Sequence, residues 1–117
     1  MLIDTRAIGF PLTDAIQRHI ESRVESALAP VNGWVLNVTA RVEDVNANRG
    51  GIDKRCGLVA SLGGGRGVVV VEALNANLYA AVDEAASRLR RSAVRSVSRP
   101  MARQRKDMQR PGALLSI

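Results

Sequence analysis

Four arginines near the end of the chain are spaced so that a single helix would present them together. Arg88, Arg91, Arg95 and Arg99 follow one another at steps of three or four residues. Successive residues of an α-helix turn by about 100°, so these side chains would share roughly one quadrant. A guanidinium group keeps its charge and offers a planar set of donors that fits phosphate oxygens. We call these four residues the arginine ridge, and it is the leading candidate for a surface that binds a polyanion.

The uneven distribution of charge along the chain supports this interpretation. The formal net charge is +6. Residues 88–110 hold nine basic side chains against one acidic residue, whereas residues 1–87 hold eight basic and ten acidic side chains. Such a segment favours a nucleic acid as partner, with an anionic membrane surface as the second choice. The competing interpretation is a solvated face that only aids solubility, and the near-neutral remainder of the chain argues against it.

Residues suited to catalysis or metal binding do not assemble into a recognisable site. His19 is the only histidine and Cys56 the only cysteine, so they cannot supply a metal-ligand set. Asp83 and Glu84 are adjacent and would not share a helix face as an acid/base pair. The glycine-rich residues 63–67 lack the Lys-Ser/Thr ending of a phosphate-binding loop and are predicted to form a hairpin turn. We therefore predict no enzyme, no cofactor and no small-molecule substrate.

The arginine ridge needs a helix to carry it, and its own segment has the periodicity of one. Asn77 is placed to cap the helix start and Pro100 to end it. Between them, apolar residues recur at steps of three or four: Leu78, Val82, Ala85, Leu89, Ala93 and Val97. Thr13 similarly precedes a first amphipathic helix, marked by Ile16, Ile20, Val24 and Leu28.

Four further segments have the alternation or the β-branched content of strands. They are residues 2–8, 34–45, 54–62 and 68–74. In the second of them, alternation predicts that Leu36, Val38, Ala40 and Val42 face the core. Short turns between the last three strands predict an antiparallel meander.

The order of predicted elements is β-α-β-β-β-α, which favours an α+β two-layer sandwich. Two helices would cover one face of a mostly antiparallel four-stranded sheet. The length of 117 residues fits one folded domain, expected over residues 1–99, followed by a basic, mobile tail over residues 100–117.

The sequence has neither the apolar run of a membrane span nor the pattern of an export signal. No apolar run approaches the roughly 20 residues needed to span a bilayer. Asp4 stands where a signal peptide would carry basic residues, and one cysteine fits a reducing compartment. We expect a cytoplasmic protein with no membrane partner.

Two short motifs resemble those of a known protein family. Residues 77–83, Asn-Leu-Tyr-Ala-Ala-Val-Asp, are followed by Arg88, Leu89 and Arg91. This pattern resembles the last-helix signature of the bacterial ribosome hibernation promoting factor and ribosome-associated inhibitor family. Residues 12–16, Leu-Thr-Asp-Ala-Ile, look like the start of that family's first helix. The order of elements agrees with the family over about residues 2–99.

The resemblance implies a fold akin to a double-stranded RNA-binding domain and a specific partner. The partner would be the small ribosomal subunit, bound through its ribosomal RNA in the channel for messenger and transfer RNAs. Occupying that channel would inhibit translation and preserve idle ribosomes under stress and in stationary phase. The family's basic positions map onto the arginine ridge and, in the first helix, onto Arg23. Arginine replaces the lysines usual in the family, which keeps the charge needed for RNA binding.

The sequence leaves two alternative functions open, together with the roles of several residues. One alternative is a protein-interaction module that modulates a stress or transcription regulator, and the other is a generic double-stranded RNA binder. Tyr79 and Trp34 are predicted to pack at the edge of the core rather than to stack on bases. Four cations beside the predicted turns either extend the RNA-binding surface or are merely exposed: Arg49, Lys54, Arg55 and Arg66.

Overall fold

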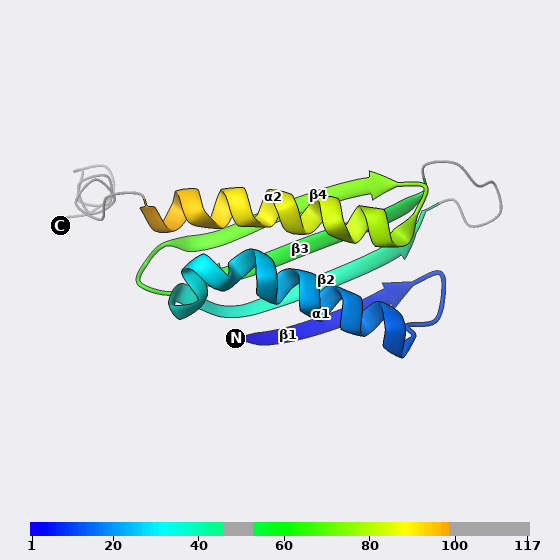
Figure 1. Ribbon diagram of the computed structural model, residues 1–117, viewed down its shortest axis with the longest axis horizontal. Coiled ribbons are helices and arrows are strands. Elements are labelled where there is room, and N and C mark those ends of the chain that lie inside the picture. The colour runs from blue at the N-terminus through cyan, green and yellow to red at the C-terminus, as the bar shows by residue number, and fades with distance from the viewer. Residues whose placement is uncertain (46–52, 99–117) are drawn as a thin grey trace, which may run out of the picture.

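Two helices lie on one face of a four-stranded sheet in the computed structural model, which describes residues 1–45 and 53–98 (Figure 1). In chain order the elements are β1 (Leu2–Ile8), α1 (Asp14–Leu28), the 3₁₀ helix η1 (Ala29–Trp34), β2 (Val35–Asp44), β3 (Lys54–Leu62), β4 (Gly67–Asn75) and α2 (Leu78–Ser98). The predicted β-α-β-β-β-α order and α+β class are confirmed. Arg49, Arg99 and the predicted tail, residues 100–117, lie outside the described residues.

The sheet has the strand order β1-β2-β3-β4. β2 pairs with β3, and β3 with β4, in antiparallel register, so the predicted meander is confirmed. β1 pairs with β2 in parallel, because α1 crosses over the sheet between these two strands. This crossover places α1 beside α2, on the same face of the sheet (Figure 1).

Both predicted helix caps are present. The Thr13 hydroxyl accepts a hydrogen bond of 3.2 Å from the backbone N–H of Ile16 at the start of α1. The Asn77 side chain accepts one of 3.1 Å from the backbone N–H of Ala80 at the start of α2. Each cap satisfies an amide that has no partner within its own helix.

The core is aliphatic and lies between the helices and the sheet. Its fully buried members include Ile20 of α1, Leu58 of β3 and Leu89 of α2. Cys56 is also fully buried, as its strand position predicts, and burial raises the pKa of its thiol to about 12. The thiol is therefore a small packing group that stays protonated at neutral pH.

One prediction about a strand face is wrong. Leu36 is 59% exposed, whereas its neighbour Val35 is buried. The register of the β2–β3 pairing shifts between Val35 and Asn37, which marks an irregularity of the β-bulge kind. An extra residue in one strand reverses the alternation on one side of it, so the remaining predicted residues face the core and Leu36 does not.

The turn between β3 and β4 packs against the end of η1. Gly64 has a φ of +68°, and a Cβ added there would lie 2.7 Å from Cζ3 of Trp34. The Arg66 guanidinium lies 4.5 Å from the centroid of the Trp34 ring and donates a hydrogen bond of 3.2 Å to the backbone oxygen of Ser96 in α2. Trp34 thus covers an edge of the fold, as predicted, and needs a glycine beneath its ring.

Candidate nucleic-acid interface

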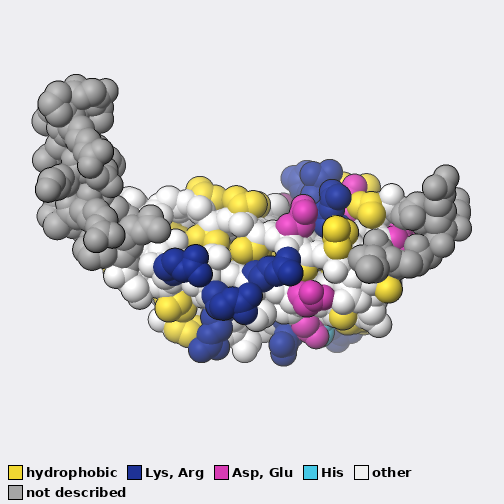
Figure 2. Space-filling view, turned by 90° about the horizontal axis from the view of Figure 1, so that it is seen from above, with side chains coloured by type: hydrophobic (Ala, Val, Ile, Leu, Met, Phe, Trp, Pro, Cys, Tyr) yellow, Lys and Arg dark blue, Asp and Glu magenta, His cyan; other side chains and the backbone are white. Residues whose placement is uncertain are grey.

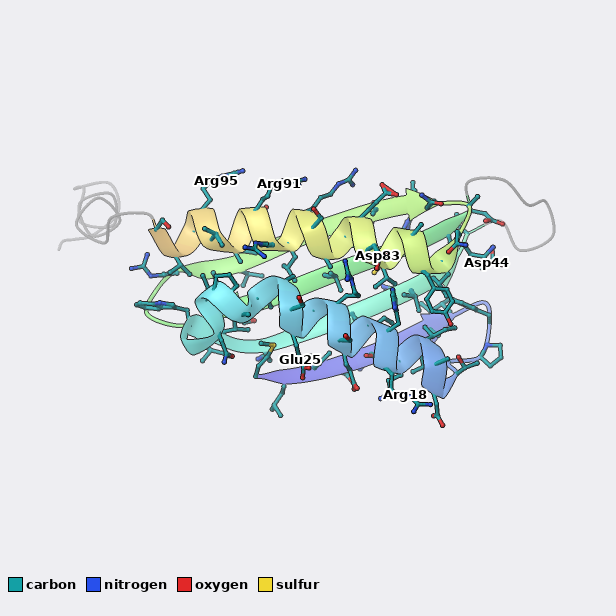
Figure 3. All side chains as sticks on the ribbon, in the orientation of Figure 1. Arg18, Glu25, Asp44, Asp83, Arg91 and Arg95 are labelled. Atoms are coloured by element: carbon teal, nitrogen blue, oxygen red, sulfur yellow. The ribbon has the colours of Figure 1, made fainter. Side chains whose placement is uncertain are left out.

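The apolar stripe of α2 determines which way its arginines face. Leu89 and Ala93 are fully buried against the sheet and α1, so the opposite side of α2 faces solvent. Arg88, Arg91 and Arg95 are all exposed. Figure 3 shows Arg91 and Arg95 projecting from the edge of α2 that is turned away from α1. The described members of the arginine ridge therefore lie together on an accessible surface.

The three described members of the arginine ridge have different neighbours. Arg88 donates a hydrogen bond through Nη1 to the backbone oxygen of Glu72, which ties it to β4. Arg91 donates one of 3.1 Å to the Ser87 hydroxyl within α2. Arg95 makes no hydrogen bond or ion pair with another residue of the described chain. None of the three pairs with a carboxylate there, so their charges are not locally neutralised.

Basic side chains gather near the end of α2 on the face of the molecule that Figure 2 shows. Figure 2 shows several Lys and Arg side chains close together on the half of this face nearest the last residues of α2. Acidic side chains, together with a second basic cluster, lie on the other half. The surface thus repeats in space the charge asymmetry of the sequence.

Arg23, the candidate on the first helix, lies apart from the arginine ridge. Its Nε is 3.1 Å from Oδ1 of Asp83 in α2, and Nε2 of His19 is 2.8 Å from the same oxygen. Asp83, a residue of the family motif, therefore joins α1 to α2. The His19 ring also meets the Tyr79 ring edge to face, with centroids 4.9 Å apart, so Tyr79 packs against the protein as predicted.

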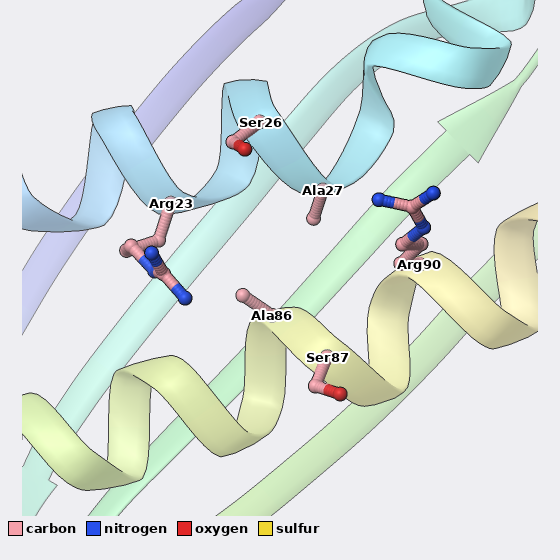
Figure 4. A pocket seen from close by; sticks show the side chains of 6 residues that line it. All are labelled: Arg23, Ser26, Ala27, Ala86, Ser87 and Arg90. Atoms are coloured by element: carbon pink, nitrogen blue, oxygen red, sulfur yellow. The ribbon is translucent and has the colours of Figure 1, made fainter.

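Arg23 borders a surface hollow together with a residue that the sequence did not single out, Arg90. Arg23 extends from α1 toward α2 and Arg90 from α2 toward α1, with Ala27 and Ala86 between them along the helices (Figure 4). We call this hollow of about 180 Å³ the notch, and it is lined by Arg23, Ser26, Ala27, Ala86, Ser87 and Arg90. On an isolated helix, Arg90 merely lies about 100° from Arg91, and only the position of α1 shows that it borders a hollow with Arg23.

A second hollow lies on the other side of Arg90. It is lined by Pro30, Arg90, Arg91, Val94 and Arg95, and its volume is about 480 Å³. Pro30 and Val94 supply an apolar surface, and three arginines surround it. We call it the apolar hollow.

The cations beside the turns are engaged within the protein. Lys54 lies 2.9 Å from Asp53 and 3.6 Å from Asp44, and the hydrogen bond with Asp53 is the main cause that raises its pKa. Arg55 forms ion pairs with Glu43 and Glu72. Arg66 is held by the contacts with Trp34 and Ser96 described above. These three residues therefore brace the sheet, and the arginine ridge is the better candidate for an RNA-binding surface.

Residues 1–45 and 53–98 contain neither a metal-ligand cluster nor a membrane-spanning helix. This part of the chain contains no group of three or more His, Cys, Asp and Glu residues placed to hold a metal ion. None of its helices is long and apolar enough to cross a membrane.

Fold and surface together define a class of protein: a small β-α-β-β-β-α sandwich whose last helix carries an exposed row of arginines. A family model described as Sigma 54 modulation protein / S30EA ribosomal protein matches residues 3–99. The chain belongs to this ribosome-associated family, which confirms the resemblance to the hibernation factors drawn from its motifs.

Two solved structures share the fold. The N-terminal domain of Protein Y from Thermus thermophilus is 25% identical, with a TM-score of 0.66 over 81% of this chain and 98% of that one. A ribosomal subunit interface protein from Coxiella burnetii is 16% identical, with a TM-score of 0.73 over 85% of this chain and 100% of that one. No curated protein matches the sequence.

Proposed function

We propose that this protein binds ribosomal RNA in the messenger and transfer RNA channel of the small ribosomal subunit and holds idle ribosomes inactive. Membership of the S30EA ribosomal protein family supports the ribosome as partner. The observation that carries the proposal is the row of Arg88, Arg91 and Arg95, exposed on α2 without a carboxylate partner in the described chain. The protein would act in the cytoplasm, by occupancy and without turnover.

The arginine ridge suits RNA because phosphate contacts dominate the affinity of such complexes. Guanidinium groups donate to phosphate oxygens without reading sequence. RNA helices offer side chains little base information in their deep groove, so shape and backbone decide the fit. The buried stripe of α2 fixes the helix, and the bonds of Arg88 and Arg91 restrain their side chains. Less side-chain freedom is then lost on binding.

A charge reversal on the arginine ridge tests the proposal. The double variant Arg91→Glu/Arg95→Glu is expected to lose co-sedimentation with purified small subunits, because both side chains are exposed and would then repel phosphate. The control variant Arg6→Glu/Arg18→Glu changes the net charge equally at exposed positions on β1 and α1. Circular dichroism checks that both variants fold.

Two outcomes contradict a role for the arginine ridge. Undiminished co-sedimentation of Arg91→Glu/Arg95→Glu would show that these side chains do not contact the subunit. Equal losses in both double variants would show that net charge alone governs the interaction.

A protein partner remains the second candidate, because the family description also names a modulator of sigma 54. In this case the basic surface would dock onto an acidic protein. Ribonuclease treatment separates the two functions: the ribosomal complex would be lost and the protein complex retained. A generic duplex binder would instead be displaced as well by free double-stranded RNA as by intact small subunits.

A further inference from the structure

The notch and the apolar hollow share Arg90, and we propose that together they hold one nucleotide of an unpaired RNA strand. The phosphate would occupy the notch, and the base would lie on Pro30 and Val94 in the apolar hollow. This inference rests on the proposed function and deepens it, because it states which part of the RNA the helix pair holds.

The two arginines of the notch are arranged for an anion. Arg23 reaches from α1 toward α2 at one end of the notch, and Arg90 reaches from α2 toward α1 at the other end (Figure 4). Arg90 makes no hydrogen bond or ion pair with another described residue. Arg23 faces Asp83 through Nε, which leaves its terminal amino groups for a ligand. Two cations that border one hollow give it a positive potential, which favours a phosphate there.

The other residues lining the notch complete a phosphate site. Ser26 and Ser87 also line the notch, and each carries a hydroxyl group. The Ser87 oxygen already accepts a hydrogen bond from Arg91, so its own proton is free to be donated to a phosphate oxygen. Ala27 and Ala86 are buried and short, and they leave space that a larger side chain would fill. No carboxylate lines the notch.

The apolar hollow explains why an unpaired nucleotide is favoured over a duplex. A duplex keeps its bases stacked inside and presents mainly sugar and phosphate. An apolar surface bordered by guanidinium groups is suited to the face of an exposed base. Pro30 and Val94 provide that surface immediately beside Arg90, Arg91 and Arg95. A phosphate site next to a base site is what one splayed-out nucleotide requires.

Fluorescence anisotropy with short RNA strands tests the site. The probes are single-stranded oligoadenylate, oligouridylate, an abasic strand of the same length, and a duplex. The wild type is expected to prefer adenylate over uridylate and to bind the abasic strand roughly tenfold more weakly, since stacking favours the larger base. It is also expected to bind the duplex more weakly than either single strand.

Variants of the notch test the phosphate half. Arg90→Ala should weaken binding of the single strands roughly tenfold and reduce the slope of log affinity against log salt by about 0.7. Arg90→Lys should restore part of the affinity, because it returns the charge but not the planar fork. Ser26→Ala/Ser87→Ala should weaken binding less than Arg90→Ala does. Arg18→Ala, an exposed arginine of α1 outside both hollows, is the matched control and should change nothing.

Three results would overturn the site: equal affinities of Arg90→Ala and Arg18→Ala, equal affinities for abasic and complete strands, or binding of duplex as tight as of single strands. Co-sedimentation with small subunits separates these failures from failure of the proposed function. If the wild type sediments with subunits and Arg90→Ala matches Arg18→Ala, the nucleotide site is wrong and the function stands. If the wild type does not sediment at all, the proposed function is wrong.

Discussion

At the scale of single residues, the arginines of α2 differ in what they do for the folded protein. Arg88 is bound to the backbone of β4, whereas Arg95 has no partner in the described chain. The same residue type on the same surface therefore differs in how far it is engaged by the fold. Under the proposed function Arg88 would serve both structural and recognition roles, whereas Arg95 would serve recognition alone.

This difference leads to a prediction about stability. Arg88→Ala should lower the free energy of unfolding by about 1 kcal/mol, because it removes a hydrogen bond from a charged donor and leaves the Glu72 carbonyl to water. Arg95→Ala should leave it within about 0.5 kcal/mol of the wild type. Urea unfolding followed by circular dichroism measures both. Equal stabilities of the two variants would contradict a structural role for Arg88.

Cys56 provides a second residue-scale prediction, on pH. Burial raises the pKa of its thiol from 9.0 to about 12. Below pH 9 both the folded and the unfolded chain hold the proton, so stability is unaffected. Above pH 9 the unfolded chain loses the proton first, so the free energy of unfolding should fall by about 1 kcal/mol per pH unit from this group.

The measurement compares urea unfolding of the wild type and of Cys56→Ala from pH 7 to pH 10. The wild type should lose stability more steeply above pH 9, although Cys56→Ala starts from a lower value because of the space it leaves. Parallel pH profiles would show that the thiol ionises in the folded state. Slow alkylation of the folded protein, and fast alkylation in urea, would agree with the raised pKa.

At the scale of elements, the turn between β3 and β4 depends on a glycine. Gly64→Ala should destabilise the protein by about 1–3 kcal/mol, because Gly64 has a positive φ and an added Cβ would meet the Trp34 ring at 2.7 Å. Gly33→Ala is the control, since nothing lies within 4 Å of a Cβ added there. Thermal unfolding measures both. A loss of stability in Gly33→Ala as large as in Gly64→Ala would refute the explanation.

The sequence could predict those features that depend on the spacing of residues close together in the chain. The apolar periodicity of α1 and α2 and the caps Thr13 and Asn77 reflect contacts within a few residues, and all four predictions are confirmed. The exposed position of Leu36 depends on how β2 pairs with β3. The notch depends on how α1 lies beside α2, which no spacing within either helix contains, so Arg90 was missed.

At the scale of the whole molecule, the charge asymmetry should govern how binding responds to salt. If the arginine ridge and the notch together neutralise about five phosphates, each doubling of salt should weaken subunit binding roughly ten- to twentyfold. Co-sedimentation at several salt concentrations gives the slope. Arg91→Glu/Arg95→Glu should flatten it, and Arg6→Glu/Arg18→Glu should not. A wild-type affinity that does not change with salt would rule out a phosphate-dominated contact.

The position of α2 in the chain determines when the arginine-bearing surface can form during synthesis. α2 packs on β3 and β4 and follows both of them in the sequence, so the strands that it covers are synthesised before the helix itself. Because the packing of the apolar stripe of α2 orients the arginines, they are presented as a row only after this helix has been synthesised and has packed. A nascent chain therefore carries no finished binding surface, and a factor of the proposed kind would not silence the ribosome that is still making it.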